Sequence, residues 1–195
     1  MKYISAVNIF EPSTQISVLC TSSKSNYKNY SFFDCWDASR NAHLYNGTNP
    51  VISHAPCAQW SSLKKFSTPD LSTWSLAIHC WKKVIKYGGV FEHPAHSSFF
   101  KFVNAPRENI LSIDQHWFGL QNHKHTWLYF SKCRPLSFPL CFDPPKFNLS
   151  NRTHFQRSET PHRLALYMAQ CINAAGLFNP VPSFKNQLEI PQGSF

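Results

Sequence analysis

The chain has 195 residues, of which 43% are hydrophobic and 15% are charged. That balance excludes an intrinsically disordered protein, because disordered chains are poor in apolar residues, and the length suits one domain with a sizeable core. Lysine and arginine outnumber aspartate and glutamate by 19 to 10, which gives a formal net charge of +9. Because a basic surface attracts phosphate, we expect a nucleic acid or a nucleotide as the partner. The alternative is that the charge only keeps the protein soluble.

The cysteines and the N-terminal segment indicate the compartment. The chain has 7 cysteines, an odd number, and no CxxC pair. The N-terminal segment lacks the pattern of a signal peptide, and no stretch approaches the roughly 20 apolar residues that cross a bilayer. We therefore expect reduced thiols, a cytoplasmic location and no membrane association.

Short apolar runs between polar loops predict the strands. In chain order they cover residues 15–20, 31–36, 50–53, 90–91 and 127–130. Helices are predicted at residues 69–87 and 161–175. In the first helix Thr68 is the expected N-cap and Pro69 the first helical residue, and Gly88-Gly89 ends it. Its apolar face is expected to consist of Leu71, Trp74, Ile78, Trp81 and Ile85.

Strands that alternate with helices predict one α/β domain over residues 1–177. Its expected architecture is a Rossmann-like, open and mostly parallel sheet flanked by helices. The proline-rich stretch 133–149 is expected to be irregular, and residues 178–195 are expected to form an extended tail.

Three residues that bear reactive or charged groups follow predicted strands: Asp37, Cys57 and Glu92. Ligands of such sheets bind at the carboxyl ends of the strands, so we expect these side chains at one edge. Cys57 is the candidate nucleophile, and positive charge nearby would favour its thiolate. Glu92 follows an apolar strand, where a raised pKa would let it pass protons. The alternatives are a buried structural thiol and a surface carboxylate.

Three segments, in this order, resemble the core of the cytosine-C5 DNA methyltransferases. His54-Ala-Pro-Cys57 resembles the nucleophile loop Pro-Pro-Cys of that family, and Phe91-Glu-His-Pro94 resembles its Glu-Asn-Val strand end. The stretch from Gln121 to Tyr129 resembles its Gln-x-Arg-x-Arg segment. The chain is also similar to small uncharacterised phage and prophage proteins, which implies the cytoplasm of a bacterial host.

The resemblance implies a methyltransferase-like fold and an enzyme that acts on a pyrimidine base in DNA or in a nucleotide. Cys57 would add to C6 of the ring, and Glu92 would bind a ring nitrogen. His123 and His125 stand where the family has arginines, and Lys124 between them is a further source of charge. The implied substrate-binding residues are His54, Pro56, His93, Gln121, His123, Lys124 and His125.

The resemblance implies S-adenosylmethionine as the cofactor, but the sequence lacks the loop that usually binds it. The family has a glycine-rich loop after the first strand, and the corresponding residues 21–28 contain no glycine. We therefore expect weak or no binding of that cofactor. The hydroxyls and lysines of this loop suit a phosphate instead, and the expected cofactor- or phosphate-binding residues are Lys24, Tyr27, Lys28 and Asp37.

Two other functions are compatible with the sequence. One is a catalytically silent module that binds nucleic acid or a nucleotide, for example to block a host defence. The other is a metal-dependent hydrolase, because the chain has 10 histidines and zinc takes histidine and cysteine ligands. Pro56-Cys57 lacks the second cysteine of the zinc deaminase motif, and we assign no residue to a metal.

Overall fold

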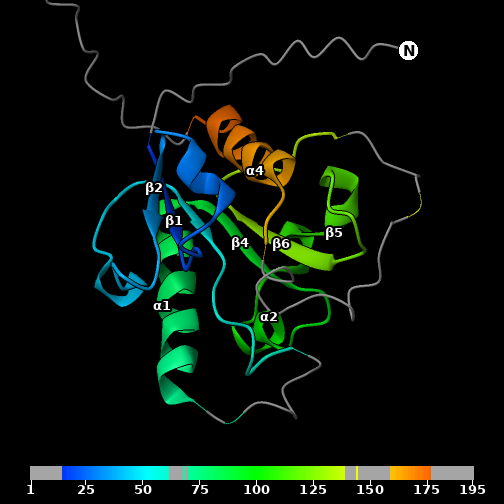
Figure 1. Cartoon of the computed structure of the whole chain (residues 1–195). Helices are drawn as coiled ribbons and strands as arrows, with labels where there is room; N and C mark the ends of the chain where they lie inside the picture. Colours follow the sequence, from blue (N-terminus) through cyan, green and yellow to red (C-terminus); the bar gives the residue numbers. More distant parts are fainter. Residues whose placement is uncertain (1–14, 62–67, 69, 139–143, 145–158, 177–195) are drawn as a thin grey trace, which may run out of the picture.

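The computed structural model of the chain describes residues 15–61, 68, 70–138, 144 and 159–176 (Figure 1). The predicted tail and most of the proline-rich stretch lie outside the described residues. The described part of that stretch, from Cys133 to Phe138, has no regular secondary structure, as expected. None of the described helices is long and apolar enough to span a membrane.

One mixed sheet of six strands runs through the domain in the order β2-β1-β3-β4-β6-β5 (Figure 1). The strands are β1 (Ile16–Leu19), β2 (Phe33–Trp36), β3 (Val51–Ser53), β4 (Gly89–Pro94), β5 (Ile110–Asp114) and β6 (His125–Ser131). β1 pairs in parallel with β2 and β3, and β3 pairs in parallel with β4. β6 is antiparallel to both β4 and β5. The predicted α/β class is thus confirmed, and the expected parallel pairing holds for β1 to β4 but not for β6.

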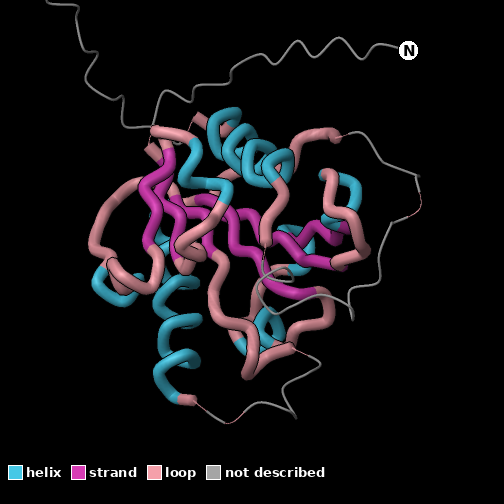
Figure 2. The backbone as a smooth tube through the Cα atoms, viewed as in Figure 1, coloured by secondary structure: helices cyan, strands magenta, loops and turns pink. Residues whose placement is uncertain are grey.

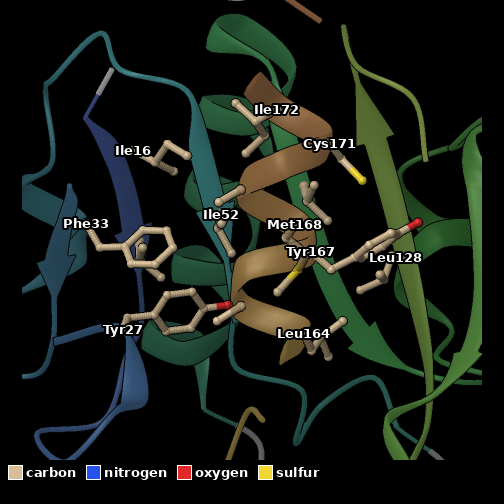
Figure 3. Close-up of a cluster of buried hydrophobic side chains, with 14 of the residues drawn as sticks. Ile16, Tyr27, Phe33, Ile52, Leu128, Leu164, Tyr167, Met168, Cys171 and Ile172 are labelled. Carbon is tan, nitrogen blue, oxygen red and sulfur yellow. The ribbon is translucent and has the colours of Figure 1, made fainter. Parts of the chain in front are cut away.

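Two helices cover opposite faces of the sheet (Figure 2). α4 (His162–Ala174) packs on the face that includes Ile52 and Val90, whereas α1 (Leu71–Tyr87) packs on the face that includes Val51 and Phe91. Successive side chains of a strand point to opposite faces, so each strand contributes to both cores. Figure 3 shows the α4 side, where Leu164, Met168 and Ile172 meet strand residues.

Helix α1 differs from its prediction at its start and in its buried face. Its N-cap is Asp70 instead of Thr68, because the Asp70 carboxylate accepts a hydrogen bond from the Ser72 N–H at 2.8 Å. The predicted apolar face is wrong at both ends, since Leu71 is 84% exposed and Ile85 37% exposed. The fully buried positions are Ala77, Cys80 and Val84, which bring the helix close to the sheet.

The end of α1 fits its prediction. Gly88 caps the helix with a φ of 84°, and Gly89 starts β4 with a φ of 126°. A Cβ on Gly89 would lie 2.0 Å from the carbonyl oxygen of Val51. Only glycine therefore allows β4 to approach β3 at this point.

Strand β5 and several short helices are absent from the predicted elements. β5 is an edge strand whose first residues are only partly buried, so its apolar signal is weak. The short helices are η1 (Asn26–Asn29), η2 (Ala42–Leu44), α2 (Phe99–Phe102), η4 (Arg107–Asn109) and η5 (Gln115–Phe118). They matter because η1 and η5 supply residues of the candidate site.

Candidate functional site

The carboxyl ends of β1, β3 and β4 lie side by side, as the parallel pairing requires. Immediately after β3, the His54 N–H donates to the Leu19 carbonyl at 3.1 Å, which fixes the start of the loop from His54 to Cys57 against the end of β1. Glu92 lies on β4, on the same face as Val90, and is only 8% exposed. The sheet thus brings the two segments that carry Cys57 and Glu92 to one edge.

A chain of hydrogen bonds crosses this edge beneath the surface. His54 Nδ1 lies 3.1 Å from Glu92 Oε2, and His54 Nε2 lies 2.8 Å from the Tyr27 hydroxyl. Gln115 Nε2 donates to Glu92 Oε1 at 3.2 Å and to Thr126 Oγ1 at 3.0 Å. An ionised carboxylate only accepts hydrogen bonds, so Nδ1 of His54 carries a proton and donates to Glu92.

The Tyr27 hydroxyl forms the other end of this chain of hydrogen bonds. Burial, and next the negative charge of Glu92, raise the pKa of the Tyr27 hydroxyl well above its ordinary value. The hydroxyl therefore stays neutral, and its oxygen lies within hydrogen-bonding distance of Nε2 of His54. Tyr27 is fully buried. Its hydroxyl contacts His54 from within the core, and Tyr27 does not line the cavity beside the end of β1.

The raised pKa expected for Glu92 is wrong. Burial by itself raises the pKa of Glu92, but the hydrogen bond from His54 and the charges of Lys124 and His54 outweigh it and lower the pKa to about 2. Neighbouring cations decide the protonation state here, not the apolar residues beside Glu92 in the sequence. Glu92 is therefore an ionised carboxylate that accepts hydrogen bonds from His54 and Gln115.

Cys57 lies in a tight loop after β3 and is partly buried. Its carbonyl accepts hydrogen bonds from the N–H groups of Trp60 and Ser61 at 3.0 and 2.9 Å. Burial and the negative charge of Glu92 raise the pKa of the Cys57 thiol, while the positive charge of Lys124 lowers it. The charges of Glu92 and Lys124 thus oppose each other at the thiol.

His93, on the other face of the sheet, holds the loop from His54 to Cys57 against β4. Its Nε2 donates to the carbonyl of Pro56 at 3.4 Å, and its Nδ1 accepts from the Ser97 hydroxyl at 2.6 Å. Burial outweighs the charge of Glu92 and lowers the pKa of His93 to about 4, so the ring is neutral. His93 and Pro56 thus position the loop, and the His93 ring is fully buried.

Of the four substrate-binding residues predicted between 121 and 125, Lys124 acts on the site, and the other three are exposed beside it. Lys124 acts on both Cys57 and Glu92, and its Nζ donates to the Glu159 carbonyl at 3.3 Å. The side chains of His123 and His125 are 55% and 71% exposed and lie beside the Asp114 carboxylate. Gln121 is exposed, and its amide donates to the Gly119 carbonyl at 3.3 Å.

Two residues of the site, Asp114 and Gln115, were absent from the predicted set. Asp114 accepts hydrogen bonds from the backbone N–H groups of His116 and Lys124, at 3.0 and 2.9 Å, and so fixes the position of Lys124. Gln115 holds Glu92, as described above. The signal in the sequence was a polar pair directly after the apolar residues of β5, and it is visible only once β5 is identified as a strand.

The predicted phosphate-binding residues separate in the structure. Lys24 lines a cavity of about 100 Å³ beside the end of β1. Lys28 does not line this cavity, and its Nζ lies 2.5 Å from Asp37 Oδ2. The hydrogen bonds from Lys28 and Ser39 lower the pKa of Asp37 and keep it ionised. Asp37 and Lys28 therefore pair with each other, and neither lines the cavity that Lys24 lines.

Among the described residues, no group of three or more histidine, cysteine, aspartate or glutamate side chains is placed to hold a metal ion. The metal-dependent alternative has no ligand set in this part of the chain. No known protein family and no curated protein matches the sequence. The functional argument therefore depends on the geometry of the site.

Proposed function

We propose that the protein is an enzyme that binds a pyrimidine base at the carboxyl ends of β3 and β4 and adds the Cys57 thiol to the ring. The supporting observation is that the nucleophile loop and the end of β4 are joined twice. His54 donates to Glu92 at 3.1 Å, and His93 donates to the Pro56 carbonyl at 3.4 Å. Both bonds are made by residues just before Cys57, so they hold its loop against the end of β4, which carries Glu92.

The proposed step starts from the protonation states described above. The proton of the Cys57 thiol moves through the Glu92 carboxylate to N3 of the pyrimidine while the sulfur attacks, so it does not rest on Glu92. The sulfur forms a bond to C6, the electrons of the C5–C6 π bond form a C4–C5 double bond, and the electrons of the C4–N3 π bond bind the proton. The resulting enamine can accept a proton at C5. His54 and Gln115 hold Glu92 throughout, and Lys124 stabilises the negative charge as it passes from the carboxylate to sulfur.

Exchange of the hydrogen at C5 tests this step without any cofactor. In heavy water, C5 of the adduct takes up a deuteron, and loss of the original hydrogen releases the thiol and leaves deuterium at C5. We expect the C5–H signal of a cytidine nucleotide to disappear in proton NMR when the protein is added. Cys57→Ala should abolish the exchange.

Cys133→Ala is the matched control, because this thiol is also partly buried but lies beyond β6, next to Gly89 at the opposite end of β4. The variant should exchange at the rate of the unchanged protein. Exchange that persists in Cys57→Ala, or that is lost equally in both variants, would contradict the proposed nucleophile.

A catalytically silent nucleotide-binding protein is the second candidate. It is favoured by the raised pKa of Cys57, since a protonated thiol is a poor nucleophile until a base accepts its proton. This candidate predicts nucleotide binding that Cys57→Ala leaves unchanged, together with no exchange at C5 in the unchanged protein.

A further inference from the structure

The cavity beside the end of β1 lies where the connections between strands change direction along the sheet. From β1 the chain passes to β2 on one side, and from β3 it passes to β4 on the other, so β1 and β3 flank a topological switch point. Open α/β sheets bind ligands in the crevice at such a point. The cavity is lined by Cys20, Thr21, Ser22, Lys24, Ser25, Asn26, His54, Glu159 and Thr160. It therefore combines the loop after β1, the residue after β3 and the segment that leads into α4.

The chemistry of the lining selects a hydrophilic ligand. Four residues carry hydroxyls, and Asn26, His54, Lys24 and Glu159 add an amide, an imidazole, an ammonium and a carboxylate. The lining contains no large apolar side chain. A ligand in this cavity must offer several hydrogen-bonding oxygens, which a sugar phosphate does and an aromatic ring does not.

The walls of the cavity are held together, and one buried hydroxyl lacks a partner. Asn26 Nδ2 donates to the Thr160 carbonyl at 2.8 Å, which joins the loop after β1 to the segment before α4. Thr21 is 8% exposed, and its Oγ1 has no hydrogen-bond partner among the described residues. Buried polar atoms are normally satisfied, so an oxygen atom of a bound ligand would complete this position.

The size of the cavity suits part of a nucleotide. Its volume is about 100 Å³, and by this measure a single water needs about 10–15 Å³. The space thus takes several waters or one sugar phosphate, but not a base in addition. His54 lines the cavity and also donates to Glu92. A base attached to a sugar in the cavity would extend past His54 toward Glu92 and Cys57.

We propose that the cavity binds the sugar and phosphate of a free pyrimidine mononucleotide, an assignment that rests on the function proposed above. Lys24 pairs with the phosphate, Thr21 and its neighbouring hydroxyls bind phosphate or sugar oxygens, and Glu159 accepts from a sugar hydroxyl. One lysine matches one phosphate. The Glu159 carboxylate repels the next phosphate of a polymer, so the substrate is a single nucleotide and not a nucleic-acid strand.

Calorimetry with four probes tests the proposal: cytidine 5′-monophosphate, cytidine, ribose 5-phosphate and a single-stranded oligonucleotide. We expect the monophosphate to bind about tenfold or more tightly than cytidine, since a charge-assisted contact contributes at least that factor. Lys24→Met should remove most of this difference and weaken ribose 5-phosphate equally. Lys82→Met, which removes the same charge from an exposed position on α1, should leave it unchanged.

Equal affinity for cytidine and its monophosphate, or equal losses in the two lysine variants, would overturn the proposal. So would an oligonucleotide that binds more tightly than the monophosphate. The exchange experiment separates this proposal from the proposed function. Binding of ribose 5-phosphate that depends on Lys24, without exchange at C5, would sustain the cavity and reject the chemistry. Exchange that is equally fast with cytidine and its monophosphate would sustain the chemistry and reject the cavity.

Discussion

Glu92 and His93 are neighbours on β4 and both are buried, yet they lie on opposite faces of the sheet and differ in charge. Glu92 lies on the α4 side, where His54 and Lys124 lower its pKa to about 2 and keep it charged. His93 lies on the α1 side among aromatic rings, where burial lowers its pKa to about 4 and keeps it neutral. The comparison shows that the α4 side supplies partners for charge, whereas the α1 side excludes it.

The aromatic packing of the α1 side should dominate stability. Phe91 stacks on Phe99 at a centroid distance of 4.9 Å and meets the edge of Trp81 at 5.4 Å. Phe91→Ala should lower the free energy of unfolding by about 3–5 kcal/mol, because it leaves a cavity in a closed cluster. Urea denaturation measures this. Phe102→Ala is the control, since Phe102 is 49% exposed; a loss of the same size there would contradict the role given to Phe91.

The neutral state of His93 should make the protein sensitive to mild acid. The unfolded chain protonates this ring near its ordinary pKa of 6.5, but the folded protein protonates it only near 4. Protons therefore favour unfolding, and stability should fall by about 3 kcal/mol as the pH drops from 6.5 to 4. His93→Gln should flatten this part of the curve of unfolding free energy against pH. Parallel curves for the two proteins would show that the ring is not held neutral.

The charge of Glu92 should affect stability at lower pH than His93 does, and its loss should affect the proposed reaction more than the fold. Its folded pKa of about 2 lies below the ordinary 4.5, so its contribution is present above pH 4.5 and is lost as the pH falls toward 2. Glu92→Gln should cost about 1–3 kcal/mol at neutral pH, because it disturbs the bonds to His54 and Gln115. It should slow exchange at C5 and leave nucleotide binding intact. Full-rate exchange in this variant would exclude Glu92 from the proton path.

The smallest effect is expected at Ser97, which donates to His93 Nδ1 at 2.6 Å. Ser97→Ala removes one neutral hydrogen bond in the buried α1 side and should lower the free energy of unfolding by about 1 kcal/mol. Ser112→Ala, an exposed position on β5, should have almost no effect. Equal values for the two variants would mean that Ser97 does not help to hold His93.

Apolar runs, and the polar loops and glycines between them, were sufficient to predict most of the fold. The runs that became β1, β3 and β6 are buried strands with clear borders, and Gly88-Gly89 marks the end of α1. The choice between Thr68 and Asp70 as the N-cap could not be made, because both residue types cap helices. β5 was missed because an edge strand needs fewer apolar residues.

The candidate site was predictable only in outline. Cys57 follows β3 and Glu92 lies on β4, and these two strands pair in parallel. The pKa of Glu92 could not be predicted, because it depends on His54 and Lys124, which the fold brings in from distant segments. The pairing of Lys28 with Asp37 likewise follows from the conformation of η1 and the end of β2.

Alkylation of Cys57 as a function of pH tests most directly whether Cys57, Glu92 and Lys124 share one site. The rate for the peptide that contains Cys57 is followed by mass spectrometry, with the Cys133 peptide as internal reference. Because Glu92 raises the pKa of this thiol and Lys124 lowers it, Glu92→Gln should move the midpoint to lower pH and Lys124→Met to higher pH. The midpoint of Cys133 should stay fixed. An unchanged midpoint for Cys57 in both variants would contradict the shared site.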